Sequence, residues 1–115
     1  MFRIPRAAMW VCASGLAVAF VLVGLSKLAG PSAMRWSERL AHWGYPAGVG
    51  YVIGVLEIFG GIGLLIAKVR RAAAVTLIAL MVGACLTHLV NAEPLRLLPP
   101  LILGGLALLI HSWRP

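Results

Sequence analysis

The sequence predicts an all-α integral membrane protein, a bundle of four membrane-spanning helices with a short interfacial helix between the first two spans. Of its 115 residues, 62% are hydrophobic and only 11% are charged, whereas soluble domains average about 45–50% and about 25%. The mean hydropathy is +0.99. The apolar residues fall into four runs, each near the ~20 residues that a helix needs to cross a bilayer. We therefore expect residues 1–115 to form a single transmembrane domain.

The first span is expected over residues 7–28. Its basic start followed by an apolar run is similar to a secretion signal. The run continues too long for the apolar part of such a signal, and no clean cleavage site follows it, so we expect an uncleaved span. Gly30 and Pro31 then predict the end of the helix.

Residues 32–43 predict a short amphipathic helix. Its apolar stripe carries Trp36 and Trp43, and its opposite face is charged. This pattern is typical of a helix that lies in the plane of the membrane interface. Trp36, Trp43 and Tyr45 are the aromatic residues expected to anchor it among the lipid headgroups. Such a helix either simply covers the bundle, forms a lid over a pocket, or presents a surface to a partner.

The remaining spans are expected over residues 47–67, 72–90 and 95–112. A basic turn separates the second from the third, and the Asn-Ala-Glu-Pro sequence at 91–94 ends the third. Pro99 and Pro100 shorten the last run to about 14 residues, or roughly 21 Å. Either that helix begins earlier and kinks at the prolines, or residues 91–98 enter the headgroup region irregularly.

The basic residues predict the orientation of the chain. With the N-terminus inside, the inner side carries six of them and the outer side four. This asymmetry favours N-in and C-in, in the cytoplasmic (inner) membrane of a bacterial-type cell. The inner six are Arg3, Arg6, Lys68, Arg70, Arg71 and Arg114, and the outer four are Lys27, Arg35, Arg39 and Arg96. No basic run has interleaved aromatic residues, so nucleic-acid binding is not expected despite the net charge of +7.

The second span carries one acid, Glu57, on a face of glycines. On a helix, Gly50, Gly54, Gly60 and Gly61 lie near Glu57, at offsets of three, four and seven residues. Glycines let a second helix approach closely, so Glu57 is expected to face protein and not lipid. Ala79 and Gly83 predict another small-residue packing pair in the third span.

Three further polar residues are expected at the depth of Glu57 or nearer the outer surface. Lys27, His88 and Asn91 end the first and third spans, so they lie in the outer half of the bilayer on the predicted topology. One reading is an outward-facing pocket that holds a quinone-like, lipid or thiol ligand or relays a proton. The other is a buried contact between Glu57 and Lys27 or His88 that only sets helix register. These residues do not decide between the two.

The sulfur-containing residues do not predict a catalytic centre. Met81, Cys85 and His88 share a helical face and would suit a soft metal, but an apolar packing stripe explains them better, and no metal site is predicted. Cys12 and Cys85 are expected at depths that differ by roughly 12 Å, too far apart for a disulfide. No activated nucleophile or cofactor motif is present, so catalysis by this chain alone is not expected.

Several short motifs, taken in order, resemble the DoxX family of small four-span membrane proteins. They are GLSKL at 24–28, GYP at 44–46, LEIFGG at 56–61, RAA at 71–73 and His88. The resemblance implies a four-helix membrane bundle. The family is named for a subunit of a thiosulfate:quinone oxidoreductase, and other members are associated with redox-stress complexes or with assembly of partner proteins.

Together, the residues and the resemblance predict a non-catalytic accessory or subunit of a membrane redox system. It would bind a small hydrophobic ligand near Glu57, and only the resemblance suggests a quinone as that ligand or cofactor. The alternative is a helper that binds another membrane protein and assists its assembly, with the polar residues purely structural. The lipid bilayer is the expected surrounding, and a partner membrane protein or a second copy of the chain stays open.

Overall fold

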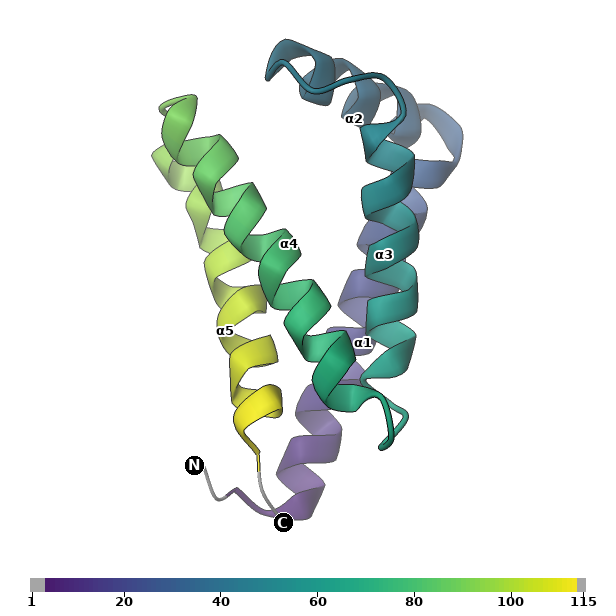
Figure 1. The fold of residues 1–115 in the computed structure, drawn as a ribbon, viewed down its shortest axis with the longest axis vertical. Coiled ribbons are helices and arrows are strands. Elements are labelled where there is room, and N and C mark those ends of the chain that lie inside the picture. Colours follow the sequence, from purple (N-terminus) through teal and green to yellow (C-terminus); the bar gives the residue numbers. More distant parts are fainter. Residues whose placement is uncertain (1–3, 114–115) are drawn as a thin grey trace.

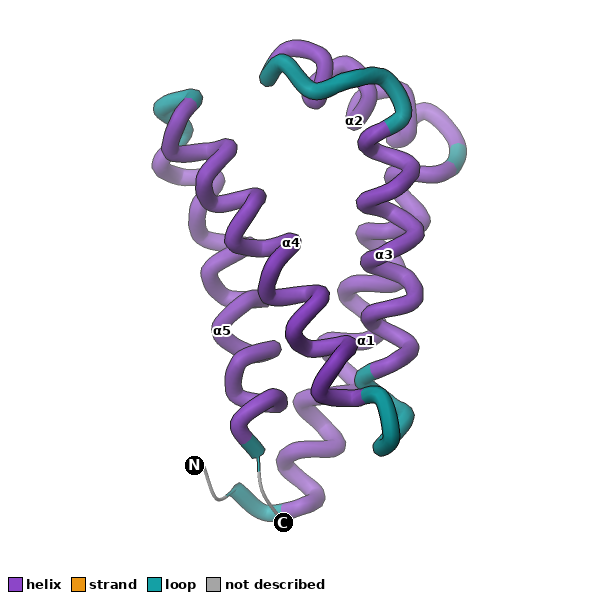
Figure 2. Tube along the Cα trace, viewed as in Figure 1, coloured by secondary structure: helices purple, strands orange, loops and turns teal. Residues whose placement is uncertain are grey.

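The computed structural model describes residues 4–113, and these residues form five α-helices and one 3-10 helix (Figures 1 and 2). The all-α class is therefore confirmed. The helices are α1 (Arg6–Leu28), α2 (Gly30–His42), α3 (Val49–Gly63), α4 (Arg70–Val90), η1 (Pro94–Leu97) and α5 (Leu98–Ser112). Arg3 and Arg114, which entered the predicted charge balance, lie outside the described residues.

Three helical segments in the described part of the chain are long and apolar enough to cross a membrane. They are Arg6–Leu28, Arg70–Val90 and Pro94–Ser112, and α3 is a shorter apolar helix. Two alternatives were expected for the last span, a kink at the prolines or an irregular segment over residues 91–98, and the structure has a change of helix type before the prolines instead. A 3-10 turn leads into α5, and Pro99 and Pro100 occupy its first turn, where a missing N–H group leaves no helical hydrogen bond unmade.

Helix α3 is shorter than the expected span over 47–67. It begins only at Val49 because Gly48 takes a left-handed conformation with φ 88°. It ends at Gly63, and the chain continues in tight turns to α4. Arg70 closes this end, since its Nε donates a hydrogen bond to the Leu64 carbonyl oxygen at 2.7 Å and its guanidinium lies 4.6 Å from the Trp10 ring centre. A residue that the sequence assigned to the inner surface is thus buried.

The helices are arranged as two pairs. Helix α1 packs along α3, helix α4 packs along α5, and α2 lies across the ends of α1 and α3 (Figure 1). The pairs meet at the end of the molecule opposite α2, around a core that includes Phe20, Leu64, Leu77 and Ala107. Towards α2 the pairs diverge (Figure 1). This divergence creates the space in which the polar residues lie.

Glycines set the closest helix contacts. A Cβ atom built on Gly54 would lie 2.8 Å from the Gly24 carbonyl oxygen, so α1 and α3 cross with their backbones in contact. The other predicted packing glycines are also buried at contacts. A Cβ would lie 3.0 Å from Leu40 at Gly50, 2.8 Å from Leu77 at Gly60 and 3.0 Å from the Ala17 carbonyl oxygen at Gly61.

The expected packing pair in α4 has a different position. Ala79 and Gly83 are exposed, and a Cβ built on Gly83 would meet nothing within 4 Å. Within the described residues, this pair does not pack against a second helix. The reason is that the two helix pairs have already diverged at this level of α4, so no helix packs on these small residues.

The α1–α3 crossing yields a stability prediction. Gly54→Ala is expected to lower the free energy of unfolding by about 1–3 kcal/mol, because the new Cβ must push the α1 backbone away. Gly105→Ala is the matched control, since a Cβ there meets nothing within 4 Å. Unfolding in mixed micelles measures both variants. Equal stability of the two variants would contradict the contact.

Candidate functional site

A central cleft lies between the two helix pairs, at the end that α2 covers. It has a lobe of about 270 Å³ on the α3 side and a lobe of about 320 Å³ on the α5 side. The lobes share so many lining residues that we treat them as one cleft: Lys27, Trp36, Trp43, Glu57, Met81, Ala84 and His88. The size of each lobe is close to the lower end of the range for ligand pockets.

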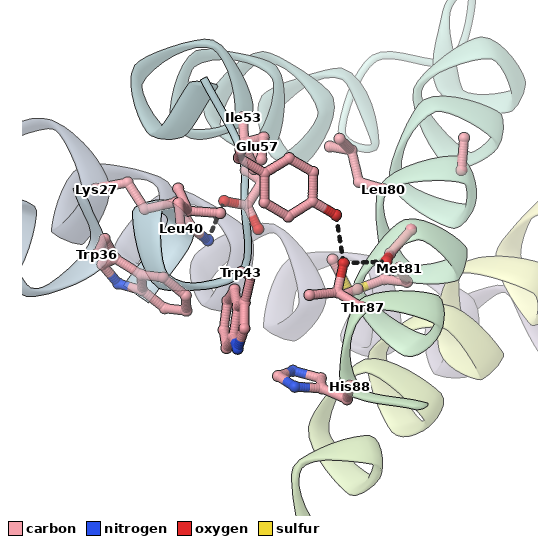
Figure 3. Close-up of a pocket in the computed structure, with 14 residues that line it drawn as sticks. Lys27, Trp36, Leu40, Trp43, Ile53, Glu57, Leu80, Met81, Thr87 and His88 are labelled. Carbon is pink, nitrogen blue, oxygen red and sulfur yellow. Dashed lines mark hydrogen bonds and ion pairs between the residues drawn. The ribbon is translucent and has the colours of Figure 1, made fainter. Parts of the chain in front are cut away.

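The most buried polar feature of the cleft is an ion pair between α1 and α3. Lys27 Nζ lies 2.6 Å from Glu57 Oε1, and the two residues are only 7% and 1% exposed (Figure 3). Each residue lies three positions after a glycine of the backbone crossing, Lys27 after Gly24 and Glu57 after Gly54. The crossing therefore places the two charges together, and each compensates the other in a region where an unpaired charge is costly.

Trp36 lies beside this pair and not only at the membrane interface. The Lys27 ammonium lies 4.3 Å from the centre of the Trp36 ring, and the Arg39 guanidinium lies 5.1 Å from it. The indole Nε1 donates a hydrogen bond to Ser26 Oγ at 3.2 Å. The ring is thus held against the cleft wall, where its face stabilises the cation. The sequence pattern indicated an anchor and did not reveal this contact.

Two side-chain contacts bridge the divergent ends of the helix pairs. The Trp43 and His88 rings meet edge to face with their centres 5.3 Å apart. The Tyr45 hydroxyl and the Thr87 hydroxyl share a hydrogen bond (Figure 3). Both contacts join the segment after α2 to the end of α4. The aromatic residues predicted as interface anchors therefore also border the cleft.

His88 lines the cleft, but its polar partner is not Glu57. Its Nδ1 lies 3.0 Å from Glu93 Oε1, and Arg96 Nη1 lies 3.3 Å from Glu93 Oε2. The pKa of Glu93 is held below its ordinary value, chiefly because its carboxylate accepts the hydrogen bond from His88. The sequence analysis did not assign Glu93 a role. The only available signal was its place in the turn directly after the helix that carries His88.

Asn91 does not belong to the cleft. Its side-chain amide donates a hydrogen bond to the Thr87 carbonyl oxygen at 2.8 Å, and the residue is exposed. It completes the end of α4, a common role for an amide side chain at a helix terminus. The structure thus brings Lys27, Glu57 and His88 to one cleft and leaves Asn91 outside it.

The sulfur-containing residues are spread over different surfaces. Cys12 and Cys85 are free thiols. Cys12 lines a separate groove between α1 and α5, whereas Met81 lines the central cleft. Within residues 4–113, no three His, Cys, Asp or Glu side chains are grouped so that they could hold a metal ion. The most buried charges of the cleft are therefore those of the Lys27–Glu57 pair, and the wall around this pair is mostly apolar and aromatic, with His88, Arg39 and Arg96 also in the lining.

The ion pair yields a double-mutant prediction. Lys27→Met leaves a buried carboxylate uncompensated and is expected to lower stability by about 3–5 kcal/mol. Adding Glu57→Gln removes the second charge and should restore much of that loss. Unfolding of the single and double variants in micelles measures the coupling between the two residues. A double variant that is less stable than Lys27→Met alone would show that the charges do not compensate each other.

The Glu93 contact yields a pH prediction. A carboxyl whose pKa is lower in the folded state contributes stability above its unfolded pKa of about 4.3 and loses that contribution as pH falls through the folded value. Between about pH 6 and about pH 3, the melting temperature of the wild type should therefore fall more steeply than that of Glu93→Gln. Parallel pH profiles for the two proteins would argue against the His88–Glu93 bond.

Comparison with known proteins assigns the chain to a family. Residues 11–110 match the model of the DoxX-like family. Searches of the curated proteins and of the solved structures gave no match. The family match covers most of α1 and α5, all of α2, α3 and α4, and every residue shared by the two lobes of the cleft. The chain is a multi-pass helical membrane protein that belongs to the DoxX-like family.

Proposed function

We propose that this DoxX-like membrane protein binds a small hydrophobic molecule, quinone-like or lipid-like, in the central cleft. It would serve as a non-catalytic accessory or subunit of a redox system in the cytoplasmic (inner) membrane. The observation that carries the binding proposal is the cleft itself, which has mostly apolar walls and holds the buried Lys27–Glu57 ion pair. The redox context comes from the family resemblance.

The charges of the cleft favour a ligand whose polar head is uncharged. The Lys27 and Glu57 charges sum to zero, so the pair has no net charge with which to compensate a charged head. The Lys27 ammonium has three N–H donors, and one of them is bonded to Glu57. A remaining donor can bind a carbonyl or hydroxyl oxygen, such as those of a quinone, a quinol or an acylglycerol.

The proposed orientation places both termini inside and α2 outside. The first helix begins, and the last ends, at the end of the molecule opposite α2 (Figure 1). Trp113 Nε1 donates a hydrogen bond to the Ile4 carbonyl oxygen at 3.1 Å, which joins these two ends directly. This arrangement puts both termini on the same side of the membrane, and the balance of basic residues favours the inside for that side. The cleft then lies towards the outer leaflet.

The second candidate function is an assembly helper for another membrane protein. The observation that favours it is the burial of Glu57, whose 1% exposure suits a purely structural ion pair. On this view Lys27 and Glu57 set the register of α1 against α3. A partner membrane protein, or a second copy of the chain, would then cover the exposed apolar surface.

Filling the cleft separates the two functions. Ala84 lines both lobes, so Ala84→Phe should reduce the quinone or lipid retained per protein by about tenfold, as expected for overpacking an apolar site. Val82→Phe is the matched control, because Val82 is an exposed residue of the same helix that lines neither lobe. Mass spectrometry of ligands retained after purification from native membranes provides the measurement. Equal retention by the two variants would favour the helper function.

A further inference from the structure

The α3 lobe of the cleft opens sideways between α3 and α4. Its upper edge is the hydrogen bond between Tyr45 and Thr87. Its lower edge is the contact of Gly60 with Leu77, where a Cβ built on the glycine would lie 2.8 Å from the leucine side chain. Between Leu77 and Thr87, α4 rises by roughly 15 Å. We call the lateral opening between these two edges the α3–α4 window.

The walls of the window are apolar. Ile53 contributes from α3, and Ala79, Leu80 and Gly83 contribute from α4. Ala79 and Gly83 are the small residues whose predicted helix partner is absent from the described chain, and both are exposed. At this level each helix presents hydrocarbon or glycine backbone to the opening. A tail of hydrocarbon can therefore pass through it without meeting a polar group.

The opposite side of the cleft is chemically different. The α5 lobe is bordered by Arg39, Arg96 and Pro99. Next to it lies a separate charged groove lined by Glu38, Arg39, His42, Trp43, Glu93 and Arg96. Charged side chains of both signs suit water and headgroups and not hydrocarbon. The two sides of the cleft therefore differ in the part of an amphiphile that each can accept.

We infer that the α3–α4 window admits an uncharged amphiphile sideways from the membrane leaflet at the α2 end. Its polar head lies at the Lys27–Glu57 pair, and its tail passes Ala79 and Gly83 back into the bilayer. This inference rests on the proposed binding function and adds the route and the class of ligand. The head is uncharged because the pair is already neutral, and the tail lies in the window because Arg39 and Arg96 line the other side of the cleft.

The route predicts which substitutions block binding. Gly83→Leu fills the window with a side chain, and the fold should tolerate it, since nothing lies within 4 Å of the new Cβ and leucine is a better helix former than glycine. Gly105→Leu is the matched control, because that position in α5 also has nothing within 4 Å and does not line the cleft. Melting temperatures of both variants show whether the fold is retained.

The probe is a monoacylglycerol with a photoreactive diazirine in its tail, added to the full chain in phosphatidylcholine nanodiscs. Cross-links should map to Ile53 and to residues 79–83, and Gly83→Leu should lower their yield by at least about tenfold. Gly105→Leu should leave the yield unchanged. An anionic fatty acid carrying the same diazirine should label the window several-fold less, because its head brings an uncompensated charge to the pair.

Two kinds of contrary result can be told apart. If Gly83→Leu is labelled like the wild type, or if cross-links map to Leu103 in the α5 lobe, the route through the window is wrong while binding in the cleft stands. Equal labelling by the fatty acid overturns the assignment of an uncharged head. If the wild type shows no cleft labelling by the monoacylglycerol and retains no quinone or lipid from native membranes, the proposed function and the inference both fail.

Discussion

The contact between the α1 and α3 backbones at Gly24 and Gly54 is the constraint on which the rest of the structure depends. A Cβ atom at either position would lie less than 3 Å from the other helix's carbonyl oxygen. Only this close crossing brings Lys27 and Glu57, one turn further along their helices, to 2.6 Å. The ion pair in turn keeps two charges from being unpaired inside an apolar protein, where neither could remain alone. The close packing of α1 on α3 and the pairing of the two charges therefore depend on each other.

The second constraint is the unequal packing of the helix pairs. At one end the pairs share a core of large apolar side chains, and at the other they diverge and are bridged by the Trp43–His88 and Tyr45–Thr87 contacts. A bundle packed evenly along its length would seal the ion pair completely. Because the divergence begins just above the level of Leu77, the pair lies on the wall of a cleft, and the same residues can hold the fold together and face a ligand.

Much of this could be predicted from local spacing, and what could not depends on distant geometry. The glycines three and four residues from Glu57 predict that it faces protein, because that requires only the periodicity of one helix. The small pair Ala79 and Gly83 gives the same signal but has no helix packed on it, since spacing alone cannot tell whether a second helix is present. The contact of Glu93 with His88 could not be predicted, because the turn after α4 sets it. Likewise, the early end of α3 depends on how Arg70 is buried.

A buried ion pair is usually judged either structural or functional, but its position in this cleft makes the two roles compatible. As a structural contact it needs only one N–H of Lys27 and one oxygen of Glu57. That contact leaves two N–H groups of Lys27 and one oxygen of Glu57 unused, and these would serve a head group that brings no charge of its own. Such a ligand would add hydrogen bonds without breaking the pair, whereas a charged one would compete with it. On the proposed function, the neutrality that lets the pair exist in the membrane would therefore also favour an uncharged ligand.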